Sequence, residues 1–155
     1  MTRMPYVPFA ILALACLTSF PAADEPAATT PKPTGTWTGT STCVGNHPAC
    51  KDEVVVYRFM PIAGEPAKVR LLADKILDGK RVPMGALDFT VAGSRLSGEF
   101  QRNTTHGLWE FRIAGDTMEG TLVLLPSREL GRRVSVHRVS DDKVPAAPAI
   151  EDYGP

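Results

Sequence analysis

The chain has 155 residues, and its 17 Lys and Arg residues are balanced by 17 Asp and Glu residues. This zero formal charge argues against nucleic acid and anionic membrane surfaces as partners, because both require a basic excess. The length fits a single domain that is large enough to bury a sizeable core.

The N-terminus has the layout of a secretory signal peptide over residues 1–23. One basic residue, Arg3, precedes an apolar run over residues 4–20, and small residues follow. A permanent membrane anchor is the alternative. Pro5 and Pro8 interrupt the run, however, and leave it short of the ~20 apolar residues that a membrane span needs.

A second processing route is a bacterial lipobox over residues 13–16, with a leader that ends at Ala15 and a lipid on Cys16. Both routes export the chain, so we expect a periplasmic or extracellular location, with membrane contact only through that lipid. Two cysteines then remain, Cys43 and Cys50, and an exported chain with two thiols usually oxidises them.

Composition divides the rest of the chain into three parts. Residues 24–34 are rich in Pro, Ala and Thr and predict a disordered linker. Residues 140–155 have a similar composition and predict a disordered tail. The folded domain is therefore expected over residues 35–139.

Within this domain, short runs of alternating polarity are separated by turn residues, a pattern typical of antiparallel sheets. Asp78-Gly79 is the strongest hairpin signal. Pro83 cannot donate to a β-ladder, which predicts an edge or a bulge at the start of its strand. We expect eight strands, at residues 35–43, 53–61, 67–77, 80–91, 95–103, 108–114, 117–126 and 132–139.

Eight antiparallel strands with short connections favour an all-β fold, an up-and-down β-barrel that closes on itself. A β-sandwich is the alternative, but it usually needs longer crossing connections. In the barrel the first and last strands are neighbours, so Trp37 and Arg138 should meet, and a guanidinium stacked on an indole is stabilising. Arg138 should point inward with Val134 and Val136, whereas His137 should face solvent.

The motif Gly35-Thr36-Trp37 on the first strand, together with Arg138 on the last, resembles the calycin group and the lipocalins in particular. In those proteins the arginine packs across the tryptophan at the closed end of an eight-stranded barrel. The resemblance implies an exported barrel with a ligand cavity. Exported calycin-like barrels also include small bacterial inhibitors of secreted proteases, which implies protein binding as the alternative.

The segment from Cys43 to Cys50 allows three interpretations. A structural disulfide that staples the loop between the first two strands is favoured. A redox pair more often has C-x-x-C spacing beside a helix end. A zinc site at Cys43, His47 and Cys50 would need reduced thiols and a fourth ligand, so no metal or cofactor is expected.

Three residues are candidates for ligand binding at one end of the barrel. His47 and His106 fall in loops at that end, and Arg102 is in phase with Phe100 and should point inward. A cationic mouth would hold an anionic head group above an apolar cavity. The alternative is that these are solvated loop residues, with an arginine that reaches out of the barrel end.

The strand expected at residues 117–126 is apolar on both faces over residues 122–125, which indicates a partner, a lipid or the folded-back tail on one face. Glycines within strands mark barrel corners or leave room inside. These glycines are Gly39, Gly85, Gly98 and Gly120.

No catalytic motif is present, and the carboxylates of Glu99, Glu110 and Glu119 fall on a polar outer face. An enzyme is therefore not expected. The sequence favours an exported binding protein that holds a small hydrophobic or amphiphilic ligand, with a protein-binding module of the cell envelope as the alternative.

Overall fold

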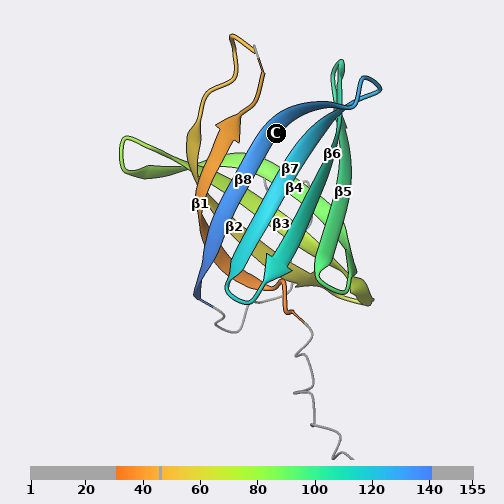
Figure 1. Cartoon of the computed structure of the whole chain (residues 1–155). Helices are drawn as coiled ribbons and strands as arrows, with labels where there is room; N and C mark the ends of the chain where they lie inside the picture. The colour runs from red at the N-terminus through yellow and green to blue at the C-terminus, as the bar shows by residue number, and fades with distance from the viewer. Residues whose placement is uncertain (1–30, 46, 141–155) are drawn as a thin grey trace, which may run out of the picture.

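The computed structural model describes residues 31–45 and 47–140. The predicted signal peptide, the lipobox with Cys16 and most of the predicted linker and tail lie outside these residues. The described chain is all β and forms one closed antiparallel barrel in the order β1-β2-β3-β4-β5-β6-β7-β8 (Figure 1). The strands are β1 (Gly35–Cys43), β2 (Glu53–Ile62), β3 (Glu65–Leu77), β4 (Lys80–Ala92), β5 (Arg95–Arg102), β6 (Thr105–Ala114), β7 (Thr117–Leu125) and β8 (Glu129–Ser140).

The predicted eight-stranded barrel is confirmed, and the β-sandwich alternative is excluded because β1 pairs with β8. Successive strands run in opposite directions, so the β1–β2, β3–β4, β5–β6 and β7–β8 connections share one end, here called the open end. The other end is called the closed end. Within the described residues, no helix has the length and apolar character that crossing a membrane requires.

The seam between β1 and β8 contains the predicted contact between an indole and a guanidinium. Trp37 and Arg138 are direct partners in the ladder, and the guanidinium carbon of Arg138 lies 4.2 Å from the centroid of the Trp37 ring. Trp37 is completely buried, whereas His137 is exposed, as the alternation predicted. The seam therefore forms in the expected register.

Arg138 also links β8 to two other segments at the closed end, residues 32–34 and the β6–β7 turn. Its Nη1 donates to the Thr34 carbonyl at 2.7 Å, and its Nη2 donates to the Lys32 carbonyl. Its Nε donates to Asp116 in the β6–β7 turn at 3.1 Å. Trp37 Nε1 donates to the carbonyl of the buried Pro33 at 2.9 Å. Residues 32–34, at the end of the predicted linker, are thus held against the barrel and cover its closed end.

Side chains fill the half of the barrel next to the closed end. Phe59, Phe89 and Phe111 contact one another edge to face, with ring centroids 5.5–5.9 Å apart. Such aromatic geometry adds roughly 0.5–1.5 kcal/mol per pair to the burial itself. The core around them is apolar and comprises Trp37, Val55, Tyr57, Val69, Leu71, Leu96, Ile113, Met118, Val134 and Val136.

The pairing between β4 and β5 is much shorter than the other pairings. These strands pair only at Thr90–Ser97, Val91–Leu96 and Ala92–Arg95, next to the closed end. Farther along, the β3–β4 hairpin projects away from the barrel, on the opposite side from the β5–β6 turn (Figure 1). The sheet is consequently open between the first half of β4 and the second half of β5.

A bulge in β4 accompanies this separation. Ala73 pairs with Gly85 while Asp74 pairs with Pro83, so Met84 is the extra residue. Gly85 has a φ of 138°, a region that favours glycine. The bulge predicted from Pro83 is therefore present, and bulges of this kind bend a strand away from its neighbour.

We predict that Arg138→Ala lowers the free energy of unfolding by roughly 2–4 kcal/mol, because the stacking on Trp37 and the bonds to backbone carbonyls are lost together. Urea denaturation measures this. Arg133→Ala is the matched control, since Arg133 is exposed on the same strand. Equal stability of the two variants would contradict a structural role for the seam contact.

Candidate functional site

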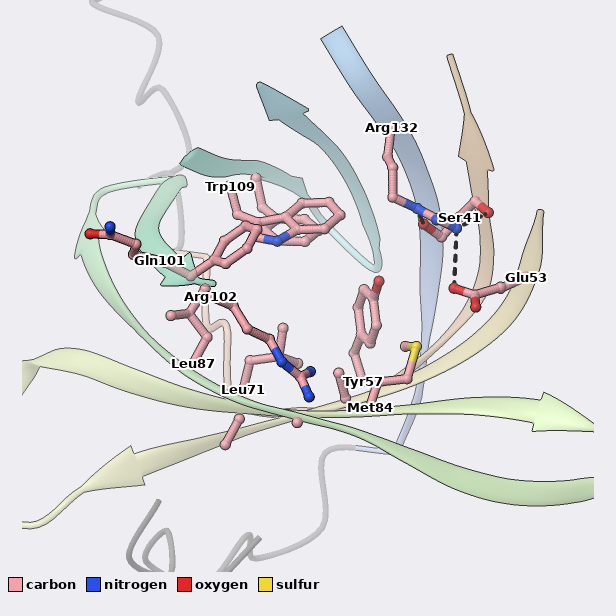
Figure 2. Close-up of a pocket in the computed structure, with 15 residues that line it drawn as sticks. Ser41, Glu53, Tyr57, Leu71, Met84, Leu87, Gln101, Arg102, Trp109 and Arg132 are labelled. Atoms are coloured by element: carbon pink, nitrogen blue, oxygen red, sulfur yellow. Dashed lines mark hydrogen bonds and ion pairs between the residues drawn. The ribbon is translucent and has the colours of Figure 1, made fainter. Parts of the chain in front are cut away.

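A cavity of about 600 Å³ occupies the half of the barrel next to the open end. Most of its lining is apolar. Ser41, Glu53 and Arg132 gather on one side of the cavity, and Arg102 reaches in from another side (Figure 2). The lining residues are Ser41, Glu53, Tyr57, Leu71, Ala73, Met84, Gly85, Ala86, Leu87, Phe100, Gln101, Arg102, Trp109, Phe111 and Arg132.

The floor of the cavity is aromatic. The rings of Trp109 and Phe111 are stacked, with centroids 5.8 Å apart and an interplanar angle of 9°. Phe111 also meets Tyr57 edge to face at 6.1 Å. Phe111 also contacts Phe59 and Phe89 in the filled half of the barrel. It therefore lies between that half and the cavity.

Gly120 lets Phe111 take this position. A Cβ atom on Gly120 would lie 2.3 Å from Cδ1 of the Phe111 ring, which no real side chain tolerates. Among the strand glycines considered from the sequence, Gly39 and Gly98 also meet close neighbours, while a Cβ on Gly85 would meet nothing within 4 Å. Three of the four thus permit close packing, and Gly85 lies at the separation between β4 and β5.

The side of the cavity is open between β4 and β5. Alternate residues of a strand face opposite sides of a sheet, so a strand that lines a cavity with its face contributes every second residue, as β3 does with Leu71 and Ala73. In contrast, β4 contributes residues 84–87 and β5 contributes residues 100–102 without a break. Their edges therefore line the cavity, and we call this gap the lateral opening.

Arg132 anchors a polar cluster on the opposite wall. Its Nε donates to Ser41 Oγ at 2.8 Å, and its Nη2 lies 3.1 Å from Glu53 Oε2 and 2.9 Å from the Lys51 carbonyl. Lys75 Nζ meets the other Glu53 oxygen at 3.2 Å. Sequence reasoning missed this cluster, although Arg132 is in phase with Val134 and Val136, and that phase indicates an inward side chain.

The predicted disulfide between Cys43 and Cys50 is confirmed. Arg132 Nη1 donates to Cys50 Sγ at 3.2 Å, and the Cys43 amide donates to Asp52 at 2.8 Å. Arg132 therefore holds the stapled β1–β2 loop from inside the barrel. Within the described part of the chain, no group of three or more His, Cys, Asp or Glu residues is placed to hold a metal ion.

Tyr57 contributes a protonated hydroxyl to the cavity wall. Burial raises the pKa of Tyr57 to about 12, against smaller lowering effects from Ser41 and Arg132. A phenol that stays neutral can donate a hydrogen bond throughout the physiological pH range.

The structure separates the three predicted ligand-binding residues. Arg102 lines the cavity, and its side chain reaches from β5 into the cavity toward Tyr57 (Figure 2). On the outer face, the Nε2 atom of His106 lies within hydrogen-bonding distance of a carboxylate oxygen of Glu99. His47 lies 3.3 Å from Glu129, which belongs to β8 at the open end. Neither histidine lines the cavity.

The apolar stretch of β7 divides between the two faces of the sheet. Leu122 is buried, whereas residues 123–125 are half-buried. On the outer face, Val123 pairs with Leu108 on one side and with Leu130 on the other. Leu108, Val123 and Leu130 thus form a small apolar row on the outer face. This row corresponds to the surplus apolar surface predicted for the strand at residues 117–126.

Comparison with protein-family models and with curated proteins gave no match to this chain.

We predict that stability falls as the pH rises from about 10 to about 12, because the unfolded chain loses the Tyr57 proton before the folded protein does. Below pH 10 both states hold this proton, so the effect is absent. Urea unfolding across this pH range measures it. Tyr57→Phe should remove this part of the decline, and an unchanged decline in the variant would contradict the assignment.

Proposed function

We propose that this protein is an exported, non-catalytic binding protein that holds one small hydrophobic or amphiphilic ligand in the cavity. The single observation that carries the proposal is a cavity of about 600 Å³ in the half of the barrel that side chains leave unfilled. Pockets for small molecules span roughly 300–1,000 Å³ and are mostly apolar with a few placed polar groups. The lining described above has this composition.

Two further features support the proposal. The closed barrel with Arg138 on Trp37 fits kinship with lipocalin-like barrels, and ligand cavities are typical of such barrels. The disulfide fits an oxidising compartment, which agrees with export of the chain. The filled half supplies the core, so the other half can remain hollow.

A protein-binding role is the second candidate, and the outer apolar row of Leu108, Val123 and Leu130 favours it. None of these three residues lines the cavity, because they lie on the outer face of the sheet. The two roles therefore depend on different residues, and one substitution can distinguish them. Val123→Lys should leave cavity binding unchanged and should abolish any protein complex that the row forms.

We predict that N-phenylnaphthylamine, a neutral apolar fluorophore, binds with saturation at one molecule per chain and takes up excitation energy from Trp109. Fluorescence titration measures both effects. The chain has two tryptophans, and the completely buried Trp37 at the closed end serves as the internal reference. Trp109→Phe should lower the energy transfer, because Trp109 lines the cavity and Trp37 remains only as the more distant donor. Transfer that does not saturate, or that is equal in the two proteins, would rule out binding in this cavity.

A further inference from the structure

Resting on the proposed function, we infer that the ligand is an amphiphile with a single anionic head group, a carboxylate, which Arg102 binds at the lateral opening. The apolar part of the ligand lies deeper, against Trp109 and Leu71. Arg102 is thereby the residue that determines specificity.

Among the charged residues that line the cavity, Arg102 is the one whose side chain has no partner within the described residues. The charged residues that line the cavity are Glu53, Arg102 and Arg132. Glu53 and Arg132 are paired at 3.1 Å. The Arg102 side chain has no hydrogen bond or ion pair within residues 31–45 and 47–140, and a guanidinium is a permanent cation in proteins. An anion from outside can therefore pair with Arg102 without breaking an existing contact.

The direction of the Arg102 side chain supports the same conclusion. A solvated arginine at a barrel end usually extends outward with its stem on apolar surface. Arg102 is exposed at the rim of the cavity, but its side chain points in among the lining residues, as Figure 2 shows. It lies on the edge of β5, directly beside the lateral opening. A head group at this position keeps contact with water while the chain behind it reaches the aromatic floor.

The single cation also limits the type of head group. A guanidinium pairs with a carboxylate through two parallel hydrogen bonds. A phosphate monoester carries between one and two negative charges near neutral pH, more than Arg102 alone can balance. The cluster around Arg132 offers no further unpaired cation, because Arg132 and Lys75 both pair with Glu53. The remaining Nε and Nη2 donors of Arg132 are taken up by Ser41 and the Lys51 carbonyl. The cavity thus suits a monoanion.

Binding of decanoate and of decanol, two probes that share one alkyl chain, tests this inference by titration calorimetry. We expect decanoate to bind more tightly than decanol. Arg102→Gln should weaken decanoate binding roughly ten- to hundredfold, the range for a hydrogen-bonded charge pair, and should leave decanol binding unchanged. Arg81→Gln is the matched control, because Arg81 is exposed on β4 and does not line the cavity.

The carboxyl pKa of bound decanoate, followed by carbon-13 NMR, provides a second measurement. Pairing with Arg102 should lower this pKa, and Arg102→Gln should raise it again. If both probes bind equally well and Arg102→Gln changes neither, the inference is overturned while the proposed cavity function stands. If neither probe binds, both are overturned.

Discussion

The structure depends on the contact between Trp37 and Arg138 at the seam between β1 and β8. An eight-stranded antiparallel sheet that stayed open would expose two strand edges, which invite pairing with other chains. Here the two edges pair with each other. The guanidinium that covers the indole also binds the Thr34 carbonyl and the β6–β7 turn at Asp116. One side chain thereby fixes the register of closure and covers the end of the core.

Packing and function are divided between the two halves of the barrel. Apolar and aromatic side chains around Phe111 fill the half next to the closed end, while the other half contains the cavity. The pair of Arg132 and Glu53 in the cavity wall is costly to desolvate, since buried ion pairs rarely stabilise more than apolar side chains would. Ser41 and the Lys51 carbonyl satisfy the remaining donors. Because the cluster adds little stability, its position in the cavity wall suggests a role in binding and not in packing.

Much of the fold could be predicted from the alternation of polarity. That alternation placed eight strands, and closure of the sheet then brought Trp37 to Arg138. The disulfide in the β1–β2 loop was predicted separately, from the two cysteines of an exported chain. The alternation also speaks against His106 as a cavity residue, because it is out of phase with the inward Trp109 and Phe111 on β6. The lateral opening could not be predicted, since it depends on how far two strands diverge. The one sequence feature connected with the lateral opening is Pro83, which predicted the neighbouring bulge.

Residue-resolved amide hydrogen exchange is the most direct test of a barrel closed at β1–β8 and open between β4 and β5. Seam amides such as those of Gly39 and Val136 should exchange only through global unfolding, because the ladder pairs them. Amides of residues 84–87 that point toward β5 should exchange orders of magnitude faster, and a bound ligand should slow them. Uniform protection around the whole barrel, with no fast segment in β4, would contradict the open side of the cavity.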